Sequence, residues 1–281
     1  MRGVTLAAVV LLTPAHAVGA QSWRTVDAFR QALAVDTLRV RIDYTVGALR
    51  VHAAGDSLLY RAQLRYDAHR FEPVRTFDAA SGTLHVGVRG DDRIPLRGSG
   101  GKEQGTLTLA LGPSQPVDLE LDLGATDSNL DFSGIPVSRL VIGSGVSELS
   151  LRFATENPVA MSELMIDAGV ASVTVDHLGN ANAERVRVSG TVGRVELDMR
   201  GAWKGTREVQ VLVTFGVATI RVPRSVGVRV THSRVLGTFD AAGFTQRGDG
   251  YVSEAWETAE QRLYIDARTT FGSLDVEWIE G

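Results

Sequence analysis

Apolar and polar residues alternate along most of the chain, and between residues 119 and 222 this alternation recurs at a regular interval. Each recurrence has a glycine followed by an apolar–polar–apolar triplet, as in Gly145 with Leu149-Ser150-Leu151. Successive glycines of this kind lie 21, 24, 24 and 23 residues apart, at Gly124, Gly145, Gly169, Gly193 and Gly216. A period of two is typical of half-buried strands, and a fixed interval of about 20 to 50 residues is typical of stacked repeats. The sequence therefore predicts an all-β fold, a single-stranded parallel β-helix (β-solenoid) with rungs of about 21–24 residues.

Each predicted rung also has an apolar pair ahead of its glycine, such as Leu140 and Ile142. We therefore expect two or three short strands per rung, joined by turns at the glycines, with alternate side chains pointing inward. Equivalent apolar residues should then stack in two internal columns. The first predicted column is Leu130, Leu149, Val173, Val195 and Ile220, and the second is Phe132, Leu151, Val175, Leu197 and Val222.

The patterning divides the chain into five parts. Period-two alternation begins at Leu38, whereas Val26, Phe29 and Leu33 approximate helical spacing. The predicted parts are a signal peptide at 1–20, an N-terminal linker or short helix at 21–37, a smaller β unit at 38–97 that continues the stack, a Gly-rich loop at 98–105, and the β-solenoid with a C-terminal cap at 106–281.

The first 20 residues have the pattern of a secretory signal peptide. Arg2 precedes a largely apolar run that ends before Thr13-Pro14, and small residues follow it. The run is much shorter than the about 20 apolar residues that cross a bilayer. We therefore expect cleavage after Ala17 or Ala20, which leaves no transmembrane anchor, and a mature protein in the periplasm or outside the cell. An uncleaved anchor is the alternative.

Composition narrows the classes of function. The chain has 29 Lys and Arg against 33 Asp and Glu, a formal net charge of −4, and no basic cluster, so it does not have the pattern of a nucleic-acid binder. It has no cysteine, which excludes disulfides and a lipid-attachment cysteine.

Candidate metal and cofactor sites are weak. No two histidines have the spacing of a metal pair, and His177 beside Asp176 reads as a turn histidine near a solvated carboxylate. Asp118, Glu120 and Asp122 alternate with leucines, which is typical of the solvent face of a strand and not of a calcium loop. The sequence predicts no metal and no cofactor.

Outward-facing residues of the rungs form the candidate interaction face. The predicted face is one column of Asp131, Ser150, Thr174, Glu196 and Arg221. As a glycosidase site it is unfavourable, because stacked rungs place Asp131 and Glu196 about 14 Å apart, whereas two catalytic carboxylates need about 5 to 10 Å. A Gly-X-Ser-X-Gly nucleophile motif in a strand-to-helix context is absent from the sequence. No catalytic residue is predicted.

Eight ordered motifs lie between residues 38 and 230. They are Val46-Gly47-Ala48-Leu49-Arg50-Val51, Leu58-Leu59-Tyr60, Leu64-Arg65-Tyr66, Leu121-Asp122-Leu123-Gly124-Ala125, Leu130-Asp131-Phe132-Ser133-Gly134, Leu178-Gly179-Asn180-Ala181, Val195-Glu196-Leu197-Asp198-Met199-Arg200-Gly201, and Val222-Pro223-Arg224-Ser225-Val226-Gly227-Val228. Their combination resembles the LiaF-like and toast-rack domains of bacterial cell envelopes, which include many domains of unknown function. The resemblance implies a β-solenoid outside the cytoplasmic membrane and supplies no catalytic residues. LiaF-like proteins take part in envelope-stress signalling and carry transmembrane helices ahead of the domain, where this chain has a predicted signal peptide.

These observations together predict an exported, non-enzymatic β-solenoid that serves as a binding or scaffold module of the envelope, with envelope-stress sensing as one role. Its expected partner is an envelope protein or a polysaccharide. The alternatives are a carbohydrate-active β-helix enzyme and a structural adhesin.

Overall fold

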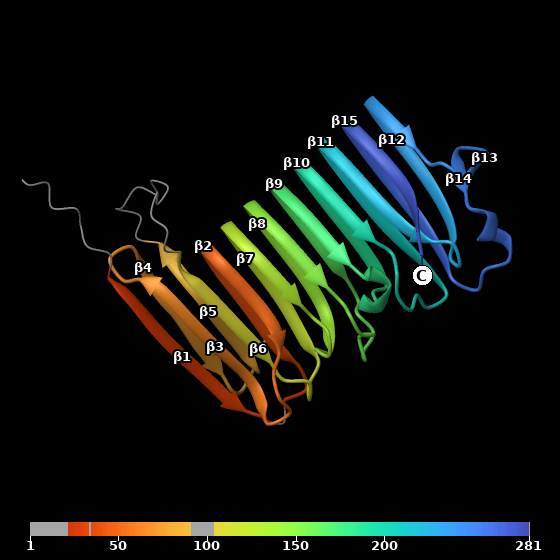
Figure 1. Ribbon diagram of the computed structural model, residues 1–281. Helices are drawn as coiled ribbons and strands as arrows, with labels where there is room; N and C mark the ends of the chain where they lie inside the picture. The colour runs from red at the N-terminus through yellow and green to blue at the C-terminus, as the bar shows by residue number, and fades with distance from the viewer. Residues whose placement is uncertain (1–21, 34, 91–103, 281) are drawn as a thin grey trace, which may run out of the picture.

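The computed structural model describes residues 22–33, 35–90 and 104–280 (Figure 1). The predicted signal peptide at 1–20 and residues 98–103 of the predicted Gly-rich loop lie outside the described residues. Within them the fold is all-β, as predicted, and the helical segments are two short 3-10 turns, η1 (Leu178–Ala181) and η2 (Glu254–Glu257). Neither turn approaches the length or hydrophobicity of a membrane-crossing helix, and the rest of the described chain contains no such helix.

Fifteen strands of the described residues join in one sheet. They are β1 (Trp23–Gln31), β2 (Leu38–Ala53), β3 (Leu58–Asp67), β4 (Phe71–Asp78), β5 (Thr83–Gly90), β6 (Thr106–Leu111), β7 (Val117–Asp131), β8 (Val137–Arg152), β9 (Leu164–Asp176), β10 (Arg185–Asp198), β11 (Thr206–Pro223), β12 (Gly227–Asp240), β13 (Thr245–Arg247), β14 (Gly250–Val252) and β15 (Arg262–Ile279).

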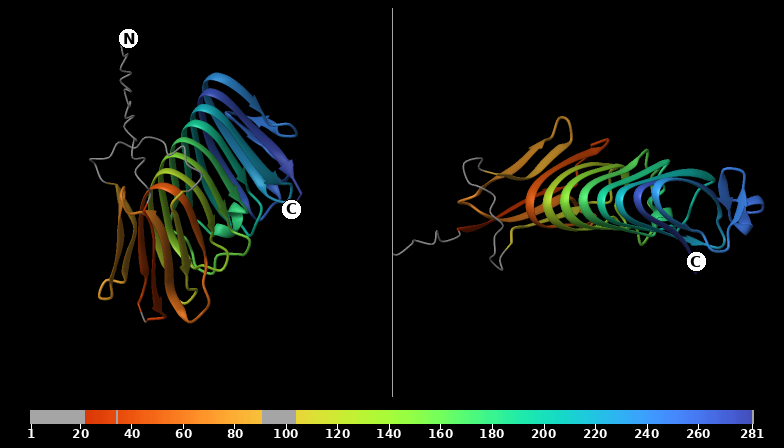
Figure 2. Two further views of the ribbon diagram at one scale, coloured as in Figure 1. Left: turned by 60° about the vertical axis from the view of Figure 1, so that its left-hand side comes forward. Right: turned by 90° about the horizontal axis from the view of Figure 1, so that it is seen from above.

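Each long strand bends over near its middle, so that it lies on both sides of the stack (Figure 2). We call the part before the bend the first limb, the part after it the second limb, and the line of bends the crest. The prediction of two or three short strands per rung is therefore wrong, because backbone pairing continues through the bend. For example, β10 pairs with β11 from Arg185 to Asp198.

Successive long strands pair in parallel, from β7 through β8, β9 and β10 to β11. The sheet departs from chain order towards both of its ends. β2 pairs with β7, so the sheet is continuous from the predicted 38–97 unit into the predicted 106–281 region. At the other end β15 lies between β11 and β12 and is parallel to both.

The N-terminal end of the stack is built from shorter strands. β5 pairs with the first limb of β2 and β6 with its second limb, so these two strands together occupy one layer of the stack. β4 and β3 then pair antiparallel with β5 and β6. The segment 23–31, where a short helix was one expectation, is instead strand β1. The helical spacing of Val26 and Phe29 is overridden because β1 covers the edge of β3 through an antiparallel ladder.

The core lies between the limbs, and on the second limbs it forms two continuous columns, whose composition differs from the predicted one. Leu149 pairs with Ser128 and Leu151 pairs with Leu130. Leu130 therefore belongs to the second column and not, as predicted, to the first. The first column is Val26, Leu64, Leu107, Leu49, Ser128, Leu149, Val173, Val195, Ala218, Leu274 and Phe239. The second is Ala28, Ala62, Leu109, Val51, Leu130, Leu151, Val175, Leu197, Ile220 and Val276.

The shift arises in β7 and β11, where Ser128 and Ala218 hold the first-column position without a large apolar side chain, so the apolar residue two positions further on resembles it. The bend itself has two glycine positions two residues apart. Gly145 lies level with Gly169, but Gly193 lies level with Ala171, two residues further along the bend. Gly193 and Gly216 share this second position. A residue that lies a fixed number of positions after the glycine is therefore at different heights in different rungs.

A side chain at the second glycine position should destabilise the fold. Gly216 has φ +149°, and a Cβ there would lie 1.8 Å from the Gly193 carbonyl oxygen. We expect Gly216→Ala to lower the free energy of unfolding by about 1–3 kcal/mol or more, measured by urea denaturation. The control is Gly55→Ala, because a Cβ at Gly55 meets nothing within 4 Å. Equal stability of the two variants would contradict the close backbone approach.

A charge in the second core column should prevent folding. Val175 is 0% exposed, so Val175→Asp places a carboxylate between the limbs without a partner. We expect no cooperative thermal transition in the circular dichroism of this variant. The neighbouring Thr174 is exposed, and Thr174→Asp should melt close to wild type. A wild-type melting temperature for Val175→Asp would refute the column.

Candidate functional site

The most distinctive surface of the described residues is a row of apolar side chains along the crest. Each long strand contributes one residue at the same height, which the strand register places side by side. We call this set the crest row. It consists of Val46, Ala125, Val146, Val170, Val192, Phe215, Phe271 and Leu236. At about 4.8 Å between neighbouring strands, eight residues span roughly 34 Å.

Six of the eight crest-row side chains are large, apolar and exposed to solvent, whereas Ala125 is small and Val46 is partly buried against the core. Val146 is 60% exposed, Val170 52% and Leu236 64%. Phe215 and Phe271 stack on each other with ring centroids 4.9 Å apart and an interplanar angle of 7°. Isolated exposed apolar residues are ordinary, but a contiguous row of them is typical of an interaction surface.

Local sequence explains why these side chains point outward. Val146 directly follows a bend glycine, whereas Phe215 directly precedes one. On the outer side of a sharp bend a side chain points away from both limbs, so it cannot reach the core between them. The sequence interpretation missed this row, although its signal was present as an apolar residue adjoining each bend glycine.

A shallow open groove of about 550 Å³ follows the crest row. Its other wall is polar and includes Asp127, Ser147, Glu148 and Ser172. Asp127 and Glu148 are exposed and have no ion-pair partner among the described residues. The groove thus combines an apolar side with an acidic side.

The predicted interaction face divides into two rows in the structure. Ser150, Thr174 and Glu196 lie level with one another on the outer face of the second limbs. Asp131 pairs in register with Arg152, and Arg221 with Asp198, which is the next outward row. The prediction of one column is wrong because Asn129 and Thr219, which follow the small core residues Ser128 and Ala218, occupy the places in the first row that were assigned to Asp131 and Arg221. A role of these residues in binding stays a prediction.

Charges on this face are mostly compensated. Arg221 lies 3.2 Å from Glu196 (Nη1 to Oε2) and 3.4 Å from Glu277 (Nε to Oε2), so it links neighbouring strands. Arg194 also lies 3.4 Å from Glu196. Asp131 on β7 and Glu196 on β10 are three strands apart, about 14 Å, which does not suit a pair of catalytic carboxylates.

The potential metal ligands Asp176, His177 and Asp198 come together near the end of the second limbs, with one ligand atom of each within 4.8 Å of the others. His177 has left-handed backbone angles, φ 57° and ψ 48°, and its Nδ1 lies 2.9 Å from Asp176 Oδ1. Arg200 Nε donates to Asp198 Oδ2 at 2.9 Å, and Arg200 Nη2 lies 3.7 Å from Asp176. The Arg200 guanidinium therefore already compensates the negative charge of Asp176 and Asp198, as a bound metal ion would.

Arg200 also determines the ionisation of Asp198. Burial acts to raise the pKa of Asp198, but the side-chain and backbone hydrogen bonds from Arg200 outweigh it, and the net pKa is lowered from 3.8. Asp198 therefore stays ionised and stabilises the turn that follows the strand.

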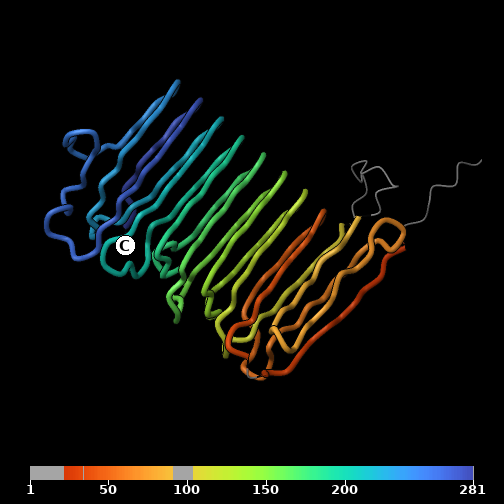
Figure 3. Tube along the Cα trace, turned by 180° about the vertical axis from the view of Figure 1, so that it is seen from behind, coloured from red at the N-terminus to blue at the C-terminus, as the bar shows by residue number. Residues whose placement is uncertain are grey.

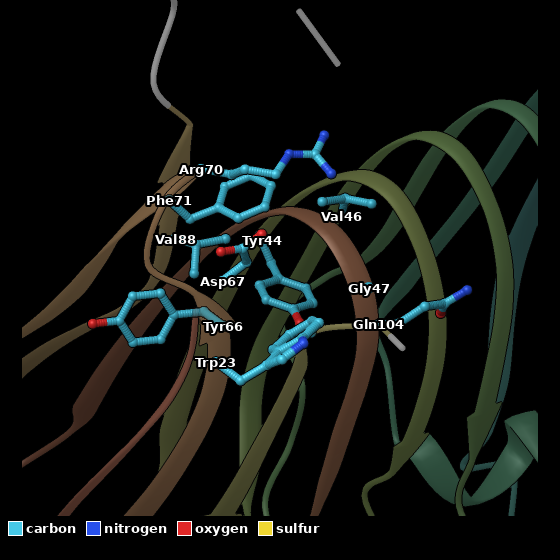
Figure 4. A pocket seen from close by; sticks show the side chains of 11 residues that line it. Trp23, Tyr44, Val46, Gly47, Tyr66, Asp67, Arg70, Phe71, Val88 and Gln104 are labelled. Carbon is cyan, nitrogen blue, oxygen red and sulfur yellow. The ribbon is translucent and has the colours of Figure 1, made fainter. Parts of the chain in front are cut away.

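A small, partly open cavity lies under the N-terminal end of the crest (Figure 4). It has a volume of about 30 Å³ and is lined by aromatic residues including Tyr44, Tyr66 and Phe71. The hydroxyl of Tyr44 is buried without a hydrogen-bond partner among the described residues, and burial raises its pKa. The cavity has room for about one water molecule and not for a substrate.

Comparison with known proteins gives a family match. The family model described as the N-terminal domain of toast_rack, DUF2154, matches residues 20–176. No curated protein matches the chain.

Three crystal structures are similar at low sequence identity. A candidate cell adhesion protein from Clostridium sporogenes is 15% identical, with a TM-score of 0.48, over 92% of this chain and 100% of that one. A candidate adhesin from Bacteroides fragilis is 12% identical, with a TM-score of 0.42, over 92% and 98%. A candidate adhesin from Parabacteroides merdae is 11% identical, with a TM-score of 0.38, over 92% and 96%.

The Asp198–Arg200 pair should make stability depend on pH. Because the folded pKa of Asp198 is lowered, its contribution is fully present above the unfolded pKa and is lost as pH falls through the folded pKa. We expect Asp198→Asn to lower the free energy of unfolding at pH 7 by about 1–3 kcal/mol. The difference from wild type should shrink as the pH falls below 3.8.

The measurement is urea denaturation at a series of pH values. Asp131→Asn, in the same outward row and without an ion pair among the described residues, is the matched control. A pH-independent difference between Asp198→Asn and wild type would show that the charge of Asp198 is not what stabilises the turn.

Proposed function

The chain belongs to the toast-rack family, and we propose that it is a non-enzymatic binding module whose crest row docks on the apolar surface of a partner protein. The observation that carries the proposal is the crest row itself. It sets aligned, exposed valine, leucine and phenylalanine side chains along six neighbouring strands, β8, β9, β10, β11, β15 and β12. These residues add nothing to the core, so their burial is available to a complex at about 25 cal/mol per Å².

A protein partner fits this surface better than a polysaccharide. Sugar hydroxyls need hydrogen-bonding groups, which the side chains of Val146, Val170 and Val192 do not have. The rings of Phe215 and Phe271 stack on each other, so one face of each ring is already covered and is not available to a sugar. Exposed Asp127 and Glu148 along the groove favour a partner whose apolar segment is flanked by lysine or arginine.

The remaining parts of the proposal concern architecture and location. Parallel pairing in chain order from β7 to β11 supports a β-solenoid as the form of the stack. The signal-peptide pattern of residues 1–20 supports export to the periplasm or beyond. Envelope-stress sensing is the role that the LiaF-like resemblance adds to this proposal.

Site-specific photo-crosslinking in the native host tests the proposal. A photoreactive residue at Val170 should crosslink one defined protein, whereas the same residue at Thr174, exposed on the second limb, should not. With that protein purified, changing Val146, Val170 and Val192 together to serine should weaken binding at least about tenfold, because apolar burial is lost. Isothermal titration calorimetry measures the change, and the melting temperature checks that the variant folds.

Two results would overturn the proposal. One is equal crosslinking from Val170 and Thr174, or an affinity that the triple variant does not change. The other is release of sugars from envelope or plant polysaccharides that is lost in Asp131→Asn, Glu196→Gln or Arg221→Ala. That second result would establish the carbohydrate-active enzyme instead.

A further inference from the structure

The two ends of the stack differ from its middle in how deeply their core residues are buried. In the first core column, every residue between the two ends is buried, but the terminal members Val26 on β1 and Phe239 on β12 are only partly buried. Figures 1 and 3 show β1 at one end of the stack and β12 at the other. The column therefore ends at each side in a residue that is only partly buried.

At the C-terminal end, only part of β12 is covered. β14 pairs with Arg229–Thr231 of its first limb. The rest of β12, from His232 through the crest residue Leu236 to the second limb at 237–240, pairs with β15 on one side and with no strand of the described residues on the other. This stretch contains no proline and no lysine, the residues that commonly protect a strand edge from pairing. Its backbone donors and acceptors are thus open to another strand.

At the N-terminal end, β1 is the outermost strand and its direction suits the open limb of β12. β1 is antiparallel to β3, and β3 is antiparallel to β6. β6 in turn is parallel to the second limb of β2. Because the two antiparallel steps cancel, β1 runs parallel to β6. It therefore runs parallel to every second limb of the stack, including that of β12.

We propose that copies of this chain assemble end to end, with β1 of one copy pairing in parallel with the second limb of β12 in the next. Continuing the register of the stack sets Val26 beside Phe239 and Thr25 beside Thr238. The first core column then runs from one copy into the next, and its two half-buried ends cover each other. Asp27, which would lie near Asp240, is already paired with Arg61 at 2.6 Å (Oδ2 to Nη2). Such a head-to-tail contact uses different surfaces on the two copies, so it extends to chains of molecules and does not stop at a dimer.

Disulfide trapping tests the pairing directly, because the chain has no cysteine of its own. Thr25→Cys and Thr238→Cys are made as two separate proteins, and both positions are exposed. Mixing them under mild oxidation should give a crosslinked pair of one copy of each. Ser172→Cys, in the same outward row as Thr238 but in the middle of the stack, is the control and should not crosslink to Thr25→Cys. Dimers of Thr238→Cys alone would show that β12 pairs with itself and would overturn the proposal.

Sedimentation equilibrium provides a second measurement without cysteines. The wild-type protein should increase in mass with concentration beyond the 30.2 kDa of one full chain, through multiples of the single copy. Thr238→Lys should weaken this association at least about tenfold, whereas Ser172→Lys should leave it unchanged. A wild-type protein that stays monomeric at the concentrations used for crosslinking, or equal effects of the two lysine variants, would overturn the proposal.

Discussion

Parallel, in-register pairing through a shared bend is the constraint on which the rest of this structure depends. Each long strand must turn at the same height as its neighbours, and the turn brings the backbones very close. A Cβ at Gly193 would lie 1.9 Å from the carbonyl oxygen of Ala171, and one at Gly272 would lie 1.7 Å from that of Gly216. The glycines therefore fix the register of the bend, and the ladders on both limbs carry that register to the strand ends.

Once the register is fixed, a residue type that repeats in the sequence becomes a row in space. Valines and leucines two residues apart become the core columns, as with Val173 and Val175. Acidic and basic residues at strand ends become a ladder of ion pairs, in which Arg221 serves both neighbours. The crest row arises in the same way, but on the outer side of the bend, where no second layer can cover it. The same geometry that stabilises the interior thus exposes the crest.

The sequence was sufficient for the all-β class, the alternation of inward and outward residues and the bend glycines, because period-two alternation and repeated glycines are local signals. It was insufficient for the register. Ser128 and Ala218 hold the first-column position of β7 and β11 without a large apolar side chain, and only their pairing with Leu149 and Val195 identifies them as core residues. The same wrong register misplaced the outward rows, including the predicted interaction face.

Non-local pairing explains the other differences. β1 has no strong strand pattern of its own, and it is a strand because the edge of β3 offers it a ladder. β15 lies between β11 and β12 although β12 precedes it in the chain. Its insertion covers β11 completely and moves β12 to the end of the stack. There Phe239 packs on His232 and Tyr251, which closes the space between the limbs but leaves the backbone edge of the second limb open. The cap therefore protects the core of the last rung and not its hydrogen-bonding edge.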